Sequence, residues 1–230
     1  MEERIQYRHE YKFLLNALDV FAVRARLQAV MPRDPHAGPG GEYRIRSLYF
    51  DDAADSALRE KLDGLSRRAK FRIRLYNDDD TFIRLEKKVK AAGLGTKISA
   101  PLTRQETEQI LAGDIAWMAG DGRGPLRELY VRMHYDGLRP KTLVDYIREP
   151  FLYAPGNVRV TLDRDIRSGG GSTGLFSASV PMVPAAEGGA IMEVKFDNFL
   201  PRVIQDIVQM TDRGAGAFSK YAACRAVTLY

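Results

Sequence analysis

Basic side chains occupy alternate positions in several short segments of the chain. In residues 70–76 (KFRIRLY), Lys70, Arg72 and Arg74 alternate with apolar residues, and residues 157–163 show the same alternation. Because successive side chains of a β-strand point to opposite faces, each basic set lies on one face of a predicted strand. Arg can donate two hydrogen bonds to phosphate oxygens and Lys supplies a compact positive charge, so these faces are suited to binding phosphate.

The same alternation selects a larger set of candidate cations. The strongest are Arg72, Arg74, Lys88, Arg159 and Lys195, and the weaker ones are Lys12, Arg44, Arg46 and Lys97. For any one of them, a solvated strand face is the simpler explanation. The pattern recurs on five predicted strands, however, and cations that converge on one site repel one another unless an anion binds among them. The set as a whole therefore indicates a polyanion site.

Carboxylates share these faces with the cations. Glu10, Glu86, Asp163 and Glu193 each lie on the same predicted face as a Lys or Arg. Carboxylate oxygens are ligands for Mg²⁺ or Mn²⁺, which also bridge to substrate phosphates. Ion pairs between neighbouring strands explain the same spacing. The residues alone leave both explanations open for Glu10 and Glu86.

Composition limits the class of protein. The chain has 230 residues, a net charge of +5 and one cysteine, Cys224, so an intrachain disulfide or a thiolate metal cluster is excluded. We expect a single domain over residues 1–230. No signal-peptide pattern or membrane-spanning run is evident, so we expect a cytoplasmic protein without direct membrane insertion, for which a membrane-bound partner stays open. We assign no catalytic role to His9, His36 or His134.

Hydrophobic periodicity predicts the elements that carry these residues. Strands are predicted over residues 5–14, 44–50, 70–76, 82–89, 141–148, 158–163 and 190–197. Helices are predicted over residues 18–31, 56–62, 103–111, 126–135, 201–210 and 218–227, with loops at 32–41 and 168–189. Seven or eight strands joined mainly as hairpins, with grouped helices, indicate an α+β fold with an antiparallel sheet. If the sheet closes into a barrel, the charged faces line a polar lumen and the apolar faces lie under the helices.

The ordered combination of these segments resembles a known family. The matching segments are 8–13 (RHEYKF), 47–51 (SLYFD), 70–76 (KFRIRLY), 85–88 (LEKK), 158–163 (VRVTLD), 192–195 (MEVK) and 218–221 (FSKY). In this order they resemble the VTC domain, the polyphosphate polymerase domain of the triphosphate tunnel metalloenzyme superfamily. The resemblance covers nearly the whole chain and implies an antiparallel β tunnel barrel with a charged lumen and flanking helices.

The resemblance also implies roles for individual residues. Arg72, Arg74, Lys88, Arg159 and Lys220 would act on the substrate phosphates as the catalytic set. Lys12, Arg46, Lys97, Lys195 and Ser219 are expected to contribute to substrate binding. Glu193 is implied as the metal ligand, with Glu86 and Glu10 as further candidates for Mn²⁺ or Mg²⁺. The polymerase pattern has a lysine where this chain has Ala217.

The expected activity is metal-dependent transfer of the γ-phosphoryl group of ATP to a growing polyphosphate chain. Two alternatives use the same residues: hydrolysis of triphosphate or short polyphosphate, and polyphosphate binding without turnover. Ala217 favours weaker polymer binding than in the polymerases. We do not expect nucleic acid as a partner, because no exposed aromatic platform for single strands is evident.

Overall fold

The computed structural model describes residues 7–186, 188–210 and 213–227. Its strands are β1 (His9–Leu15), β2 (Tyr43–Asp51), β3 (Arg67–Tyr76), β4 (Asp79–Ala91), β5 (Leu94–Leu102), β6 (Arg139–Tyr153), β7 (Val158–Ser168), β8 (Val183–Pro184) and β9 (Ala190–Phe196). Its α-helices are α1 (Ala17–Val30), α2 (Ser56–Leu62), α3 (Arg104–Ala112), α4 (Gly124–Tyr135), α5 (Arg202–Val208) and α6 (Lys220–Ala226). Two short 3₁₀ helices are η1 (Ala116–Gly120) and η2 (Pro155–Asn157).

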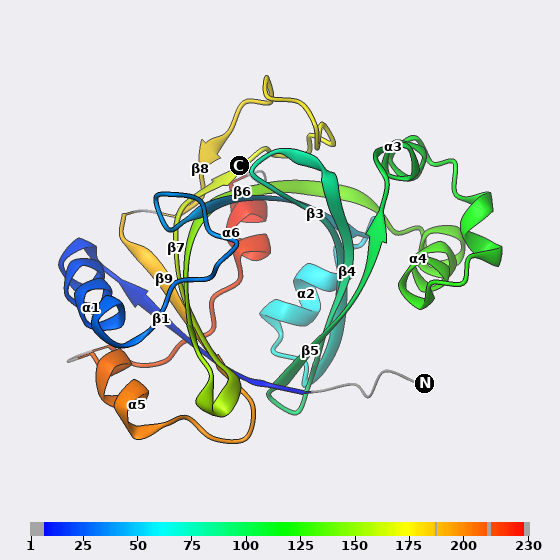
Figure 1. The fold of residues 1–230 in the computed structure, drawn as a ribbon. Helices are drawn as coiled ribbons and strands as arrows, with labels where there is room; N and C mark the ends of the chain where they lie inside the picture. Colours follow the sequence, from blue (N-terminus) through cyan, green and yellow to red (C-terminus); the bar gives the residue numbers. More distant parts are fainter. Residues whose placement is uncertain (1–6, 187, 211–212, 228–230) are drawn as a thin grey trace.

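The strands form one antiparallel sheet that curves around a tunnel (Figure 1). Its order is β1-β9-β7-β6-β2-β3-β4-β5, and β8 pairs with β7 outside this path. The two ends of the sheet meet at Arg8 and Gly95, whose backbones exchange hydrogen bonds of 2.9 and 3.0 Å. In the described part of the chain no continuous ladder joins β1 to β5, so the tunnel wall is not a fully closed barrel.

Apolar side chains cover the outside of the tunnel wall, as the alternation predicts. On one side, Ile73 and Leu85 pack in a core with Leu129 of α4. On the other side, Val160 packs in a second core with Val23 of α1. Figure 1 shows α3 and α4 on the first side, and α1 and α5 on the second. The helices thus turn the charged strand faces inward.

The third core lies within the curve of the sheet. Cys224 and Tyr221 of α6 are buried there with Leu58 of α2 and with Tyr146 of β6. Figure 1 shows α6 inside the curve formed by β6 and β7, with α2 nearby. Arg225 of α6 also pairs with Asp55, 2.6 Å away, just before α2. One end of the tunnel is therefore bordered by the packed pair α2 and α6.

Capping explains where the first and third helices begin. Asn16 and Asp19 form a reciprocal capping box, in which the Asn16 side chain accepts from the Asp19 N–H at 2.8 Å. Thr103 and Glu106 form the same motif at the start of α3. Both devices satisfy backbone donors that have no partner within the helix, and both lie within a residue or two of the helix starts predicted at residues 18 and 103.

The predicted elements are confirmed, with shifts at their ends. The first predicted strand begins at residue 5, but residues 5 and 6 lie outside the described residues and β1 begins at His9. The helix predicted over 201–210 spans Arg202–Val208, with Pro201 at its N-cap position. The strands β5 and β8 were not predicted, and β8 lies within the predicted loop over residues 168–189. Gly95 and Pro101 are poor strand formers, and Pro101 is tolerated because β5 lies at an end of the sheet.

Candidate functional site

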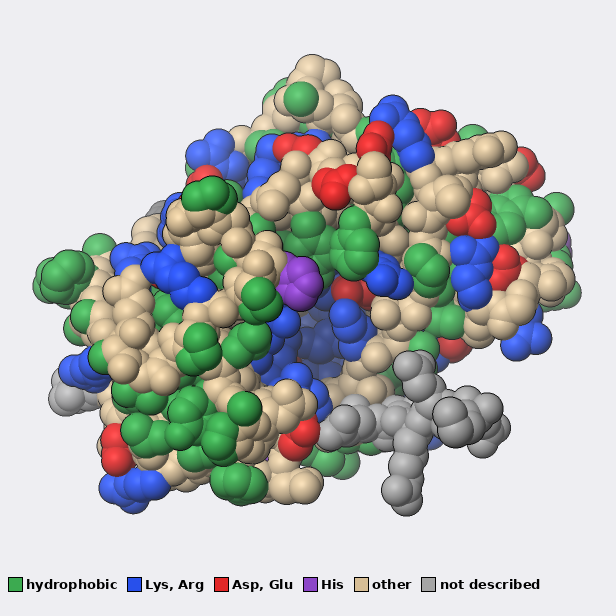
Figure 2. All heavy atoms as spheres, viewed as in Figure 1, with side chains coloured by type: hydrophobic (Ala, Val, Ile, Leu, Met, Phe, Trp, Pro, Cys, Tyr) green, Lys and Arg blue, Asp and Glu red, His purple; other side chains and the backbone are tan. Residues whose placement is uncertain are grey.

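The predicted charged faces surround a cavity of about 1100 Å³ inside the tunnel. The predicted residues that line it are Glu10, Lys12, Arg72, Arg74, Lys88, Lys97, Arg159, Glu193, Lys195, Ser219 and Lys220. Figure 2 shows the hollow with Lys and Arg side chains gathered inside it. Glu10 and Glu193 are the two acidic residues among the described lining residues. The cavity is therefore strongly cationic, and an anion is its natural ligand.

One wall of the cavity is built on β3 and β4. The antiparallel register places Arg72 opposite Glu86, and Arg72 Nε donates to Glu86 Oε2 at 2.7 Å. Lys97 Nζ of β5 donates to Glu86 Oε1 at 2.7 Å, and Arg74 Nη1 lies 3.7 Å from Glu86 Oε2. Burial would raise the pKa of Glu86, but Arg74, Arg72 and Lys97 hold it well below the usual value. Glu86 thus stays charged and fixes three cations.

Tyr49 of the neighbouring strand β2 contacts cations of the same wall. Its hydroxyl accepts a hydrogen bond from Arg72 Nη1 at 2.7 Å. Lys70 Nζ lies 5.3 Å from the centre of the Tyr49 ring and 5.6 Å from that of Tyr221. Among the described residues, no carboxylate forms an ion pair with Lys70. Its positive charge is therefore left for a ligand.

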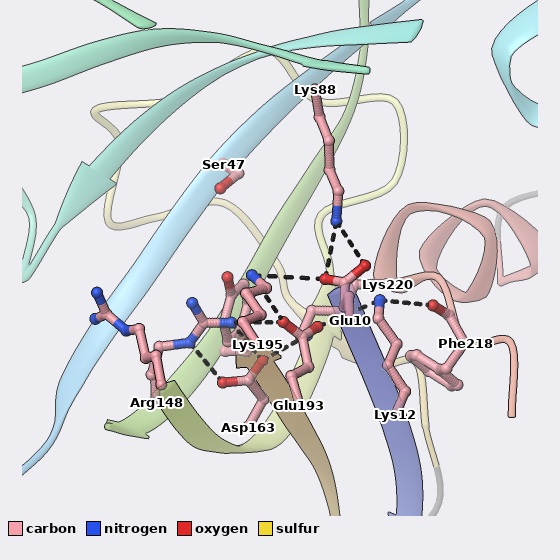
Figure 3. Close-up of polar contacts among 12 residues, drawn as sticks. Glu10, Lys12, Ser47, Lys88, Arg148, Asp163, Glu193, Lys195, Phe218 and Lys220 are labelled. Carbon is pink, nitrogen blue, oxygen red and sulfur yellow. Dashed lines mark hydrogen bonds and ion pairs between the residues drawn. The ribbon is translucent and has the colours of Figure 1, made fainter. Parts of the chain in front are cut away.

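The opposite wall is built on β1, β9 and β7 (Figure 3). The register places Glu10 opposite Lys195 and Lys12 opposite Glu193. Lys88 Nζ lies 3.0 Å from Glu10 Oε1, Lys195 Nζ lies 3.3 Å from Glu193 Oε2, and Lys12 Nζ lies 3.3 Å from Glu193 Oε1. The two carboxylates therefore lie on neighbouring strands, enclosed by lysines.

The start of α6 completes this wall. Ser219 caps the helix, since its hydroxyl accepts from the Ala222 N–H at 3.3 Å. Lys220 Nζ then lies 2.9 Å from Glu193 Oε1 and 2.5 Å from Asp163 Oδ2. Asp163 is fully buried and also pairs with Arg148 at 2.6 Å. A buried network of ion pairs thus holds the first turn of α6 against the cavity.

Burial and like charges shift the pKa values of several lysines in the cavity. Burial, together with the nearby charges of Lys12 and Arg72, lowers the pKa of Lys70 to about 8 against the opposing effect of Tyr49. Burial also lowers the pKa of Lys88 and of Lys195, despite the nearby carboxylates. These lysines crowd one another, and a bound polyanion would relieve the repulsion.

Arg159 connects the cavity to the loop that precedes β2. Its Nη2 donates to Asp34 Oδ2 at 2.8 Å and to the Tyr43 hydroxyl at 2.6 Å. Its Nε is buried and has no hydrogen-bond partner among the described residues. Buried donors without a partner are uncommon in folded proteins and mark a place where a ligand or water completes the structure.

Two predicted site residues lie elsewhere. Arg46 faces away from the cavity and is buried against Asp145, 2.9 Å away, because Ser47 and Tyr49 occupy the inner face of β2. Glu86 is 1% exposed beneath its three cations and does not line the cavity. In this structure neither side chain reaches the cavity, so we do not carry either residue into the proposal for substrate or metal binding. Arg44, a weaker candidate, lies on the same outer face and also pairs with Asp145.

The predicted set of site residues leaves out several cations that line the cavity, although Lys70 was placed on the same strand face as Arg72 and Arg74. Lys70, Arg84 and Arg148 face it together with the predicted cations. Lys70 and Arg84 share the inner faces of β3 and β4 with Arg72 and Lys88, so the period-two rule alone identifies them. Arg148 lies at the end of the predicted strand 141–148, and its face of that strand carries no other Lys or Arg that would have indicated a cationic face.

Glu10 and Glu193 are the residues that could hold a divalent metal. Mg²⁺ is usually bound by one or two carboxylates together with water and substrate phosphates, and this pair fits that requirement. The described residues contain no group of three or more His, Cys, Asp or Glu arranged to hold a metal ion by themselves. Phosphate oxygens would therefore have to complete the coordination.

Residues 7–229 match the model of the VTC domain. The chain belongs to this family. Among solved structures, HpAC1 from Hippeastrum aligns over 98% of this chain and 98% of its own, with 13% sequence identity and a TM-score of 0.56. A protein from Bacillus halodurans described as a "putative adenylate cyclase" aligns over 97% of this chain and 86% of its own, with 17% identity and a TM-score of 0.47. No curated protein matches the VTC-domain chain.

The similarity to HpAC1 supports the triphosphate tunnel fold of this VTC domain. Within the described residues, no helix has both the length and the apolar character needed to cross a membrane.

Proposed function

We propose that the tunnel binds the phosphates of a nucleoside triphosphate and transfers the γ-phosphoryl group to a growing polyphosphate chain. The observation that carries this proposal is the convergence of Arg72, Arg74, Lys88 and Arg159 on one cavity with few carboxylates. Such an array neutralises several phosphate groups at once. Phosphoryl transfer depends mainly on positioning and on stabilising charge, so it does not require a protein nucleophile.

The residues act in the transfer step by holding the reacting oxygens. The terminal phosphate oxygen of the chain attacks the γ-phosphorus, the bond from that phosphorus to the β–γ bridging oxygen breaks, and a nucleoside diphosphate leaves. Arg72 and Arg74 are held in place by Glu86, so they bind phosphate without first having to become ordered. Lys88, Lys195 and Lys220 supply charge from the other strands and from α6.

Glu193 and Glu10 would hold Mn²⁺ or Mg²⁺ against the phosphates. A bound divalent ion supplies charge neutralisation and orients the phosphate oxygens. Lys12, Lys195 and Lys220 already hold the pKa of Glu193 well below its usual value against the effect of burial, so its carboxylate is ionised and available as a ligand. The lysines that pair with it in the free protein would then be released to the phosphates.

Hydrolysis of a triphosphate is the second candidate. Ala217 lines the cavity at the position where the polymerase pattern has a lysine. A missing cation there weakens the hold on an acceptor chain and favours water as the attacking group. HpAC1, the structural neighbour from Hippeastrum, is described as having a dominant triphosphatase activity.

The test is incubation with ATP labelled in its γ-phosphate, with Mn²⁺ or Mg²⁺, followed by sizing of the products. Polymerisation yields labelled chains longer than three phosphates, whereas hydrolysis yields orthophosphate. Arg72→Ala should lower turnover by the equivalent of about 2.7–4 kcal/mol, by analogy with loss of one oxyanion donor. Arg127→Ala, on the exposed face of α4, is the matched control and should leave turnover unchanged. Absence of both products with either metal contradicts an enzymatic function.

A further inference from the structure

Aromatic rings cluster at one mouth of the tunnel. Tyr43 and Tyr76 line the cavity, with ring centres 5.5 Å apart and nearly perpendicular planes. Phe82 continues this group 5.9 Å from Tyr76, and its side chain is 46% exposed. We call Tyr43, Tyr76 and Phe82 the aromatic rim. Figure 2 shows hydrophobic side chains beside the opening of the basic hollow.

The aromatic rim continues the rows of cations on β3 and β4. Tyr76 follows Arg74 by two residues on the same strand face, a distance of roughly 6–7 Å along the strand, and its hydroxyl accepts from Arg74 Nη1 at 3.4 Å. Phe82 precedes Arg84 by two residues, and the Arg84 guanidinium lies 4.6 Å from the Phe82 ring centre. No carboxylate in the described part of the chain pairs with Arg84. A planar group bound at the aromatic rim would lie next to phosphates held by Arg74, on the side toward the mouth of the tunnel.

The other end of the cavity differs in chemistry. Lys61, Arg68 and Lys90 line it there. Burial lowers the pKa of Lys61, and Arg68, Lys12 and Lys90 lower it further, so these cations lie within range of one another. Tyr49 and Tyr221, which lie toward that end, are buried and stack on each other with ring centres 5.2 Å apart. That end therefore suits phosphate, whereas at the aromatic rim the Phe82 ring is exposed and Tyr76 is half-buried, with Tyr43 buried beside Tyr76.

We infer that the aromatic rim stacks the base of the donor nucleoside triphosphate, and this inference rests on the function proposed above. Every base has a π-face, and Phe, Tyr and Arg side chains stack on it without reading its identity. The nucleoside then lies at the β3–β4 hairpin, and its phosphates run inward past Arg74 toward Lys88 and α6. The cations bind the phosphates of a nucleotide and of an inorganic triphosphate alike. The aromatic rim therefore distinguishes the two ligands, because only the nucleotide has a base.

The experiment compares two ligands on the same variants. Dissociation constants for ATP and for inorganic tripolyphosphate are measured by calorimetry in one Mn²⁺ buffer. Phe82→Ala should weaken ATP binding roughly 5- to 100-fold, the range for loss of one base–aromatic stack, and should change tripolyphosphate binding less than about twofold. Phe82→Leu, which keeps apolar bulk, should show the same selective loss, whereas Phe82→Trp should retain ATP binding. Phe21→Ala, an exposed phenylalanine of α1, is the control and should change neither ligand.

The outcomes distinguish base stacking by the aromatic rim from phosphate binding in the tunnel. Unchanged ATP binding by Phe82→Ala, or a parallel loss of both ligands, overturns the base-stacking assignment. Failure of the wild-type protein to bind tripolyphosphate contradicts the phosphate tunnel itself. Selective loss of ATP binding with tripolyphosphate binding intact supports both.

Discussion

Glu86 and Glu193 alternate with cations in the same way in the sequence, but the tunnel gives them different surroundings. Glu86 is 1% exposed and is enclosed by Arg72, Arg74 and Lys97, so it has no free oxygen facing the cavity. Glu193 lines the cavity, and its partners there are three lysines and Arg148. We therefore propose that Glu86 positions the arginines and that Glu193 binds the metal.

The two glutamates should respond differently to replacement by glutamine. Glu86→Gln leaves buried cations without compensation and should lower the free energy of unfolding by about 3–5 kcal/mol, as measured by urea denaturation. Added tripolyphosphate should restore part of this loss because it binds only the folded protein. Glu193→Gln should instead raise the Mn²⁺ concentration needed for half-maximal turnover. A raised Mn²⁺ requirement in Glu86→Gln with Glu193→Gln unaffected would reverse the assignment.

Lys70 should make phosphate binding depend on pH. Its pKa of about 8 in the free protein means that it is charged below this pH and loses its charge above it. Burial would raise the pKa of Tyr49, but Arg72 and Lys70 lower it to about 8, so ionised Tyr49 would oppose anions over the same range. Tripolyphosphate affinity should therefore fall as the pH rises from about 7 to about 9.

Lys70→Arg is the control for this dependence, since arginine keeps its charge throughout. Its affinity should fall less than that of the wild type between the same pH values, and the comparison cancels any change in the ligand's own ionisation. Equal pH dependence in both proteins would show that Lys70 does not face the phosphates.

At the scale of elements, α6 links fold stability to the site. The helix has seven residues and begins at the Ser219 cap, and its first residue, Lys220, pairs with Asp163 and Glu193. Ser219→Ala should lower the free energy of unfolding by about 1 kcal/mol, the usual cost of losing such a cap, and should weaken tripolyphosphate binding. Ser219→Asn, which retains a capping oxygen, should keep the stability in urea denaturation. If both variants lose stability equally, the cap is not what holds α6.

Most of the strands that line the tunnel could be predicted from the sequence. Alternation of charged and apolar residues predicted β3, β4, β7 and β9, because a wall with one polar and one apolar face must follow a period of two. The same rule failed at Arg46, since the inner face of β2 carries Tyr43, Ser47 and Tyr49 rather than cations. Which face turns inward is decided by packing between strands that are distant in sequence, and one segment does not contain that information.

At the scale of the whole molecule, the cavity results from curvature of the sheet and from the helices outside it. The sequence patterns predicted antiparallel strands and a charged lumen, and the structure confirms the tunnel, although within the described residues its ends are joined only by the bridge between Arg8 and Gly95. The pairing of Glu10 with Lys88 and of Lys220 with Asp163 could not be predicted, because each pair joins residues more than fifty positions apart. Such contacts depend on strand order, which the hairpin pattern does not determine.

The most direct test of the account is a crystal structure of the protein with inorganic tripolyphosphate and Mn²⁺. We predict density for the phosphates inside the tunnel, within hydrogen-bonding distance of Arg72, Arg74 and Arg159, and an anomalous Mn²⁺ signal beside Glu193. Phosphate density confined to the outer surface of the sheet, with Lys88 and Lys195 still paired to Glu10 and Glu193 as in the free protein, would contradict this prediction.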